Sequence, residues 1–280
     1  MDKFATVPAG ALVQPQSFTL HVPEQDIADF KALLRLSKIG PRTYENGTSR
    51  YGVTRDWLAH AKETWLNSFS WRSHEEHINS FPNFKPSVED PALGRSCTHF
   101  AALFSKKNDA IPVIFMHGWP GSFLEFLPMM TLLAEKYIPE TLPFHAIVPS
   151  LPGYTLSDGP PMDRDCDVDD IARIMNQLMV DLGFGRKGYV AQGGDIGCFV
   201  ARKLIIASNE CKAIHINFMS HIREMGQEGP RDELTADELA HLERANDFTK
   251  SGMAYAQEHA TRPGTIGLVL SSSPLATLAW

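Results

Sequence analysis

The chain of 280 residues has only four cysteines, Cys97, Cys166, Cys198 and Cys211, and no two of them have a short pair spacing. Closely spaced cysteines mark zinc sites and disulfide frameworks, so we expect neither, and reduced thiols of a cytosolic protein are the simpler interpretation. The eleven histidines include no His-Glu-x-x-His pair. The sequence therefore predicts no metal site.

Long hydrophobic runs are missing as well. No stretch approaches the roughly 18 apolar residues of a membrane span, and the start, MDKFATVPAGALVQ, lacks the charged and apolar parts of a secretory signal. Lys and Arg number 26 against 33 Asp and Glu, a net charge of −7 without long like-charge runs. This balance argues against nucleic acid or an anionic membrane as the main partner. We expect a soluble, cytoplasmic protein.

Short apolar segments alternate with helical patterns from Cys97 onward. Four of them suit buried strands: Ile111–Met116, Phe144–Pro149, 188–192 and 213–219. Residues 1–96 instead carry helical spacings, and after residue 219 the strands cease. The pattern predicts an α/β fold with a mostly parallel sheet and helices on both faces. We expect three segments: a helical arm (1–96), the core (97–219) and a further helical segment (220–280).

Two weaker motifs have structural explanations. Gly183-Phe-Gly185-Arg-Lys-Gly188 matches the dinucleotide fingerprint, but it follows a predicted helix and precedes a strand, so no helix N-terminus faces a pyrophosphate. A helix end followed by a turn explains it better. The aspartates between 163 and 170 resemble a calcium loop, yet Val168 replaces its glycine and Ile174 its glutamate. Acids at a helix N-terminus explain that cluster.

The stretch YVAQGGDIGCFV places Asp195 between a predicted strand and a predicted helix. Gly193 and Gly197 stand two residues before and after it, as a nucleophile elbow requires, because that strained turn leaves its neighbours no room for side chains. An aspartate that caps the helix explains the same stretch equally well.

A second loop favours the nucleophile. IFMHGWPGSFLEF places His117, Gly118, Trp119 and Pro120 after a buried strand, and Ser122 with Glu125 forms a capping-box pattern. In α/β-hydrolases this loop supplies one backbone N–H of the oxyanion hole. The residue after the nucleophile, here Ile196, supplies the other. Two such loops in the right order are unexpected by chance.

The motifs HGWPGSFLEF, VPSLPGYTLSDGPP and QGGDIGCFVAR resemble the epoxide hydrolases of the α/β-hydrolase superfamily, most closely the soluble fungal relatives of the microsomal type. The N-terminal part, with RLSKIGPRTYE and INSFPNFK, is similar to that family's arm, which wraps the core and helps to hold a homodimer. GMAYAQEHATRPGTIGLVLSSSPLATLAW resembles the start of its helical lid. The resemblance covers the chain from about Phe18.

The resemblance implies a small-molecule epoxide and water as substrates, a vicinal diol as product, and no cofactor. Asp195 attacks a ring carbon to form an alkyl ester, which suits a carboxylate because it is already ionised at neutral pH. Tyr255 donates a proton to the epoxide oxygen, and the oxyanion hole is Trp119 and Ile196. The supporting turns consist of His117, Gly118, Pro120, Gly193, Gly194 and Gly197.

In the family a histidine with its acid activates the water, and a second lid tyrosine assists; all three follow later than Trp280. We therefore expect a C-terminally truncated member with an incomplete core and a partial lid, and full turnover is not expected. Two alternatives stay open. One is a haloalkane dehalogenase-like hydrolase, although that family places a tryptophan where this chain has Ile196. The other is a non-catalytic relative that binds a small molecule or partner. Detoxification and secondary metabolism are both compatible roles.

Overall fold

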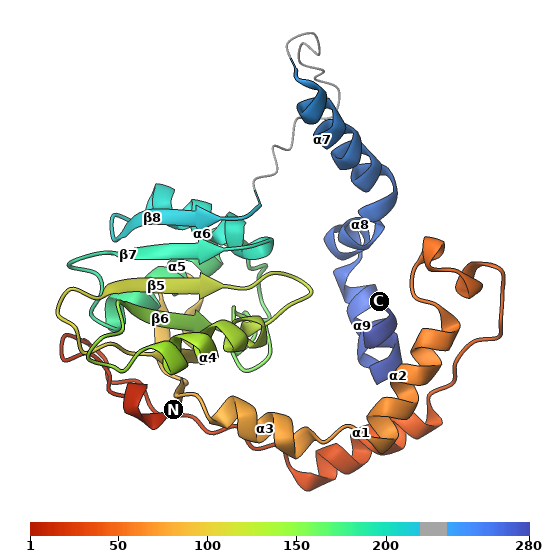
Figure 1. Ribbon diagram of the computed structural model, residues 1–280, viewed down its shortest axis with the longest axis horizontal. Helices are drawn as coiled ribbons and strands as arrows, with labels where there is room; N and C mark the ends of the chain where they lie inside the picture. The colour runs from red at the N-terminus through yellow and green to blue at the C-terminus, as the bar shows by residue number, and fades with distance from the viewer. Residues whose placement is uncertain (219–233) are drawn as a thin grey trace. The chain divides into compact units, whose positions relative to one another are not determined.

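The computed structural model describes residues 1–218 and 234–280 (Figure 1). The expected boundary between core and lid, at residues 219 and 220, lies outside the described residues. The described chain forms two compact units, one of residues 1–21 and 72–218, the other of residues 22–71 and 234–280. The predicted three-segment division stays a prediction; residues 1–21 and 72–96 group with the core.

The first unit is built on a six-stranded sheet in the order β1-β4-β6-β5-β7-β8. The strands are β1 (Asn83–Phe84), β4 (Phe100–Leu103), β5 (Ile111–Met116), β6 (Phe144–Pro149), β7 (Tyr189–Gly193) and β8 (Cys211–Ile216). β6, β5, β7 and β8 are parallel, whereas β1 and β4 pair antiparallel at one edge. β2 (Ser87–Asp90) and β3 (Gly94–Cys97) form a separate hairpin. The predicted mostly parallel α/β sheet is confirmed.

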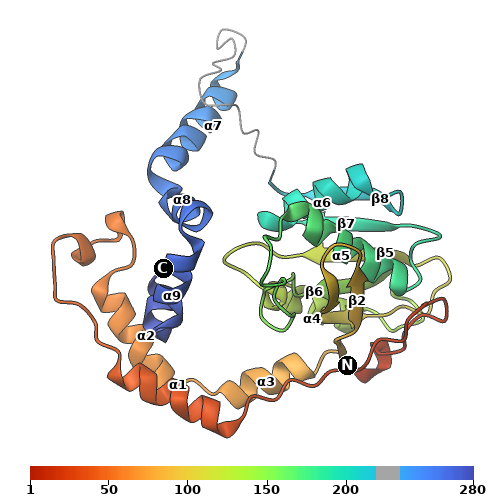
Figure 2. The ribbon, with the colours of Figure 1, turned by 180° about the vertical axis from the view of Figure 1, so that it is seen from behind.

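Helices cover both faces of this sheet. α4 (Leu127–Lys136) lies on one face, and α5 (Val168–Asp181) and α6 (Ile196–Ala207) lie on the other (Figures 1 and 2). β4 shows why the strands are apolar throughout: Phe100 and Ala102 pack into the cluster beneath α5, and Ala101 and Leu103 into the cluster beneath α4. Side chains alternate between the two faces of a strand, and both faces are buried here. α3 (Trp71–Asn79) and the 3-10 turns η1 (Asp2–Phe4) and η4 (Phe123–Phe126) complete the unit.

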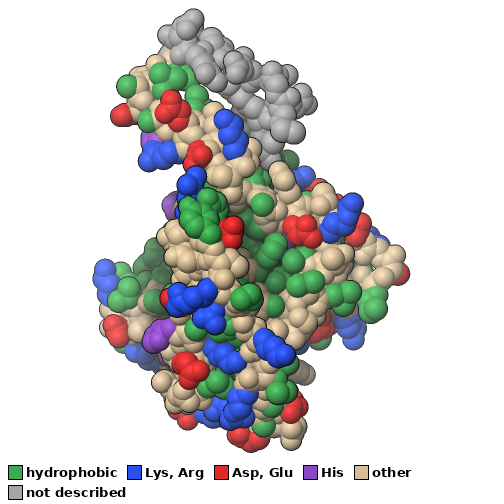
Figure 3. Space-filling view, turned by 90° about the vertical axis from the view of Figure 1, so that its right-hand side faces the viewer, with side chains coloured by type: hydrophobic (Ala, Val, Ile, Leu, Met, Phe, Trp, Pro, Cys, Tyr) green, Lys and Arg blue, Asp and Glu red, His purple; other side chains and the backbone are tan. Residues whose placement is uncertain are grey.

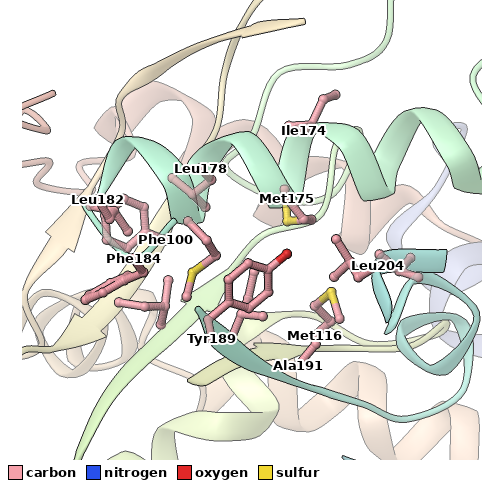
Figure 4. Close-up of a cluster of buried hydrophobic side chains, with 14 of the residues drawn as sticks. Phe100, Met116, Ile174, Met175, Leu178, Leu182, Phe184, Tyr189, Ala191 and Leu204 are labelled. Atoms are coloured by element: carbon pink, nitrogen blue, oxygen red, sulfur yellow. The ribbon is translucent and has the colours of Figure 1, made fainter. Parts of the chain in front are cut away.

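The core beneath α5 is formed by the apolar side of that helix and by strands of the sheet (Figure 4). Met175 and Leu178 of α5 are almost fully buried and pack with Tyr189 of β7. Burying such a side chain contributes about 1.5–3 kcal/mol. The phenol of Tyr189 donates a hydrogen bond to Asn176 Oδ1 at 2.8 Å. This bond satisfies the one polar group that Tyr189 brings into the core.

The two weaker motifs are structural, as predicted. Gly183 (φ 87°) follows the end of α5, and Gly188 (φ 86°) precedes β7, so both supply left-handed turn positions. Asp167 caps α5, and the Asp170 carboxylate accepts a hydrogen bond from the Asp167 N–H, which completes a capping box. Two arginines neutralise Asp170 further, Arg164 at 3.0 Å and Arg173.

The second unit is helical in the residues that the structure describes. Its helices are α1 (Glu24–Leu36), α2 (Arg55–Asn67), α7 (Ala236–Asp247), α8 (Ala254–Thr261), α9 (Pro263–Ser271) and α10 (Pro274–Ala279), with 3-10 turns η2 (Glu45–Gly47) and η3 (Ser49–Tyr51) and the π turn η6 (Phe248–Gly252). Phe30 and Trp65 join α1 to α2 with ring centroids 5.6 Å apart. Lys62 Nζ donates to the carbonyl of Ser37 at 2.6 Å, beyond the end of α1. Both the predicted arm helices and the helical segment after the sheet are present.

The surface carries charges of both signs: acidic and basic side chains are interspersed on the face shown in Figure 3. Among the described residues, no helix has the length and apolar character needed to cross a membrane.

Candidate active site

The strand order of the sheet reverses between β5 and β7. From β5 the chain passes to β6 on one side, and it then returns to β7 on the other side of β5. Ligands of open α/β sheets bind at such a switch point, outside the carboxyl ends of the strands. Residues 117–120 follow β5 here, and Asp195 follows β7.

Asp195 has a strained backbone, with φ 48° and ψ −120°. Non-glycine residues rarely adopt a positive φ, and such strain concentrates at functional sites. A Cβ on Gly193 would collide with the Gly197 carbonyl, and one on Gly197 with the Met116 carbonyl. Among the described residues, the Asp195 side chain makes no capping hydrogen bond to α6. The helix-cap interpretation is therefore wrong, and the geometry is that of a nucleophile elbow.

The carboxylate of Asp195 is held by the loop that follows the neighbouring strand, β5. The backbone N–H of Trp119 donates a hydrogen bond to Asp195 Oδ1 at 2.7 Å, the short length typical of a charged acceptor. Gly118 permits this approach, because a Cβ there would lie 2.5 Å from Asp195 Cβ. The Trp119–Pro120 peptide bond is cis. Ile196 begins α6, so its N–H belongs to the first turn, where backbone donors have no intrahelical acceptor.

His117 is a fully buried part of the same loop. Its Nδ1 donates to the carbonyl of Gly118 at 3.0 Å, and its Nε2 accepts from the Leu151 N–H at 3.1 Å, which fixes the neutral tautomer. Burial lowers the pKa of His117, and the Gly118 hydrogen bond partly offsets this. His117 therefore ties the loop after β5 to the loop after β6, as a supporting residue.

Two further side chains near Asp195 were not predicted as part of the site. Burial, followed by the charge of Asp195, raises the pKa of the Glu125 carboxyl, against a hydrogen bond from the Gly118 backbone. Burial and Asp195 also raise the pKa of Tyr154, whose ring lies edge-on to His117 with centroids 4.8 Å apart. Tyr154 follows β6, so its position after a parallel strand was the available signal.

The capping-box prediction for Ser122 and Glu125 was half right. Ser122 caps η4, since its hydroxyl accepts from the Leu124 N–H at 3.3 Å. The Glu125 carboxylate lies beside Gly121 instead: a Cβ on Gly121 would be 2.9 Å from Glu125 Oε2.

Gly194 lies beside Asn217, the residue after β8: a Cβ on Gly194 would be 2.9 Å from Asn217 Oδ1. Tyr255 belongs to the second unit, on α8, where its ring lies edge-on to His259 with centroids 6.4 Å apart. In residues 1–218 and 234–280, no group of three or more His, Cys, Asp or Glu side chains is placed to hold a metal ion.

Comparison with known proteins places this geometry in a family. The model described as "Epoxide hydrolase N terminus" matches residues 15–126, and that of the "alpha/beta hydrolase fold" matches residues 111–261. A Dothistroma septosporum protein that carries the name "Putative epoxide hydrolase" is 42% identical over all of this chain and 67% of its own length. The chain belongs to the epoxide hydrolase family. Its fold is that of the α/β-hydrolases.

Solved structures agree with this assignment. The structure of Aspergillus niger epoxide hydrolase matches 99% of this chain and 71% of its own chain, with a TM-score of 0.93 and 49% identity. Juvenile hormone epoxide hydrolase of Bombyx mori, at 23% identity and a TM-score of 0.74, shares the fold. This chain therefore spans about two thirds of the length of the fungal relatives, and the match includes both Asp195 and the loop after β5.

Proposed function

We propose that this epoxide hydrolase family member opens an epoxide by attack of Asp195 on a ring carbon. The observation that carries the proposal is the hydrogen bond from the Trp119 N–H to Asp195 Oδ1 at 2.7 Å. This bond occupies one carboxylate oxygen and leaves Oδ2 as the nucleophile. A bond forms between Oδ2 and the ring carbon, and the carbon–oxygen bond of the ring breaks.

The released alkoxide takes its proton from the phenol of Tyr255. This role rests on the family resemblance of the α8 segment. The alkyl ester then needs water at its carboxyl carbon, and an oxyanion develops on the former Oδ1. The Trp119 N–H, already directed at that atom, and the Ile196 N–H would stabilise the oxyanion. Collapse of this intermediate releases the vicinal diol and restores the carboxylate.

Ester hydrolysis also requires a base. His117 does not suit the role, because both ring nitrogens are engaged and its pKa is lowered by burial. The resemblance assigns water activation to a histidine and an acid later than Trp280. In the polypeptide of residues 1–280 we therefore expect the ester to form faster than it hydrolyses.

The test is intact-mass measurement of the 280-residue polypeptide after exposure to a reactive epoxide such as styrene oxide. We expect a mass increase of one epoxide per chain, absent in Asp195→Ala. Sustained diol production would contradict ester accumulation, and an unchanged mass with reversible binding would instead support a non-catalytic binding relative. Halide release from a haloalkane panel would support the dehalogenase-like alternative, which Ile196 after the nucleophile disfavours.

We also propose that the arm contributes to a homodimer. Leu36 and Trp57, on α1 and α2, are 78% and 49% exposed, and such apolar surface is typical of partner contacts. Light scattering after size exclusion should give twice the 31.1 kDa of one chain. A monomeric mass at micromolar concentration would contradict this proposal.

A further inference from the structure

The loop after β6 holds the imidazole of His117 at two points. The Tyr154 ring lies edge-on to this buried imidazole, with centroids 4.8 Å apart and ring planes at 66°. Edge-to-face contact is a favourable arrangement of two aromatic rings. From the same loop the Leu151 N–H donates to His117 Nε2 at 3.1 Å. The position of the imidazole therefore depends on where this loop places the Tyr154 ring.

His117 transmits its position to the nucleophile. Its Nδ1–H donates to the Gly118 carbonyl at 3.0 Å. The Trp119 N–H belongs to the same peptide group, and in a planar trans peptide the C=O and the N–H point in opposite directions. Fixing the Gly118 carbonyl from one side therefore directs the Trp119 N–H toward Asp195 Oδ1, which it reaches at 2.7 Å.

The backbone of Tyr154 is fixed by two successive turns. Its N–H donates to the Leu151 carbonyl at 2.9 Å, and its carbonyl accepts from the Ser157 N–H at 3.1 Å. Thr155, the next residue, has φ 43°, a left-handed conformation that is rare for a β-branched side chain. Such a conformation persists only where the surrounding structure fixes it.

A chain of hydrogen bonds from the core holds Thr155. Asn83 Nδ2 donates to two backbone carbonyls, so Asn83 Oδ1 accepts from His99 Nε2 at 3.0 Å. His99 is fully buried, which lowers its pKa to about 3, so the ring is neutral and its Nδ1 accepts the Ser150 hydroxyl at 2.9 Å. Ser150 Oγ in turn accepts the Thr155 hydroxyl at 2.8 Å. The direction of each hydrogen bond is thereby determined, and the chain ends at the strained residue.

We propose that Tyr154 is a positioning residue for the nucleophile, Asp195. Its ring keeps His117 in place and thereby directs the Trp119 N–H at the carboxylate. The buried chain that ends at Thr155 keeps the loop that carries this ring in its strained conformation. The inference rests on the proposed function, in which Asp195 attacks the epoxide. Tyr154 acts through its ring, and its hydroxyl takes no part in proton transfer.

The test uses the rate at which styrene oxide modifies Asp195 in the 280-residue polypeptide, measured by mass at several epoxide concentrations. In Tyr154→Ala we expect the rate at saturating epoxide to fall at least about tenfold, with the half-saturating concentration unchanged, because the orientation of the carboxylate is lost. Tyr154→Phe keeps the ring contact with His117, so we expect at least about half of the original rate. Tyr137→Ala removes another partly buried tyrosine, at the end of α4, and should react like the unmodified sequence.

A second pair of variants tests the buried chain. Thr155→Val has nearly the same shape and the same branching at Cβ, but it lacks the hydroxyl that Ser150 accepts. We expect the saturating rate to fall at least about threefold, the effect of losing one hydrogen bond of the loop. Thr155→Ser keeps the hydroxyl and should retain at least about half of the rate. Equal rates in the two variants would overturn the role of the chain.

Equal saturating rates for Tyr154→Ala and the unmodified sequence would overturn the inference about the ring. So would a Tyr154→Phe rate as low as that of Tyr154→Ala, because the hydroxyl would then be the group that matters. A rise in the half-saturating concentration alone would also overturn it, by showing a role in binding. If the unmodified sequence forms no adduct, the proposed function fails; if it does and Tyr154→Ala reacts equally fast, only this inference fails.

Thermal unfolding of each variant confirms that the compared proteins are folded. If Tyr154→Ala does not fold, Tyr154→Leu takes its place, because it keeps much of the apolar volume and lacks the aromatic ring. The same loss of saturating rate is expected for Tyr154→Leu, and an unchanged rate would overturn the inference.

Discussion

Trp119 and Asp195 are 76 residues apart in the sequence, and the N–H of the first donates to Oδ1 of the second at 2.7 Å. The contact joins the ends of two neighbouring parallel strands, β5 and β7. It aligns one oxygen of the carboxylate with a backbone donor before any substrate arrives. A donor that is already oriented costs no reorganisation at the moment of reaction, which is what makes such groups effective.

Gly118 should be intolerant of any side chain. In Gly118→Ala the new Cβ would lie 2.5 Å from Asp195 Cβ and 2.8 Å from its Oδ1, so the carboxylate must move away from the Trp119 N–H. Because a displacement of about 1 Å can cost about 100-fold in rate, we expect modification of Asp195 by styrene oxide to slow by about that factor. Gly159→Ala is the control, since a Cβ there meets nothing within 4 Å. Unchanged reactivity of Gly118→Ala would show that the close approach does not matter.

His117 should stabilise the fold as well as the site. Removing its ring in His117→Ala leaves the Leu151 N–H and the Gly118 carbonyl without their partner. A buried group left unsatisfied costs about 1–3 kcal/mol, so the free energy of unfolding in urea should fall by at least that amount. His215→Ala, at an exposed position of β8, should change it by less than about 0.5 kcal/mol. Similar losses in the two variants would refute the special role of His117.

Two buried histidines should make stability depend on pH. Burial lowers the pKa of His99 to about 3 and that of His145 to about 4, from 6.5. Well above pH 6.5 both histidines are neutral in the folded and in the unfolded state, so protonation does not reduce the free energy of unfolding there. As the pH falls below 6.5 the unfolded state takes up the protons first, and stability decreases until the folded state is protonated as well. Each histidine adds a slope of up to about 1.4 kcal/mol per pH unit in this window.

Urea unfolding at pH 6.5, 5.5 and 4.5 measures that slope. His99→Gln removes one titrating group while keeping an amide for Ser150 and Asn83, the two partners of the ring. We expect the free energy of unfolding to fall less steeply with decreasing pH in this variant than in the unmodified protein. An identical decline would mean that His99 is not buried in its neutral form.

The ion pairs between β2 and α5 should contribute more than those at the surface. Arg173 pairs with Asp90 at 3.0 Å and with Asp170, and both carboxylates are at least 95% buried. Removing one partner of a fully buried pair costs about 3–5 kcal/mol. The Arg173 side chain is 43% exposed, so Arg173→Met should lower the unfolding free energy by less, about 1–3 kcal/mol, the cost of leaving buried polar groups without a partner. Because Arg164 still neutralises Asp170, the lower end of this range is expected.

The matched control is Lys203→Met. Lys203 pairs with Asp169 at 2.8 Å, but both side chains are about half exposed. Exposed pairs contribute about 0–1 kcal/mol. Equal effects of the two substitutions on the free energy of unfolding in urea would contradict the importance of the buried carboxylates, Asp90 and Asp170, with which Arg173 pairs.

The strands of the sheet were the most predictable feature. β5 and β6 have the predicted bounds, because strands buried on both faces are short uninterrupted apolar runs. β7 begins at Tyr189, one residue later than predicted, since Gly188 has φ 86° and belongs to the turn. The last residue of the predicted strand 213–219 lies outside the described residues, and β8 ends at Ile216.

Only those parts of the site that leave a local sequence pattern could be predicted. Glycines on either side of Asp195 revealed the elbow, because only glycine fits against the backbone there. The sequence did not decide whether Asp195 caps α6 or faces the loop after β5. That outcome depends on a hydrogen bond from the Trp119 N–H, 76 residues away, which no local pattern indicates. Glu125 was hidden for the same reason: its spacing from Ser122 indicates a capping box, and its position beside Gly121 depends on the folded loop.

The most direct test of the account is to locate the modification. The polypeptide of residues 1–280 is treated with styrene oxide and digested, and the peptides are sequenced by tandem mass spectrometry. We predict a single ester on the side chain of Asp195. Hydroxylamine should cleave it, because it attacks the carbonyl carbon of an ester. A modification on cysteine, histidine or another carboxylate, with Asp195 unmodified, would contradict the assignment of Asp195 as the nucleophile.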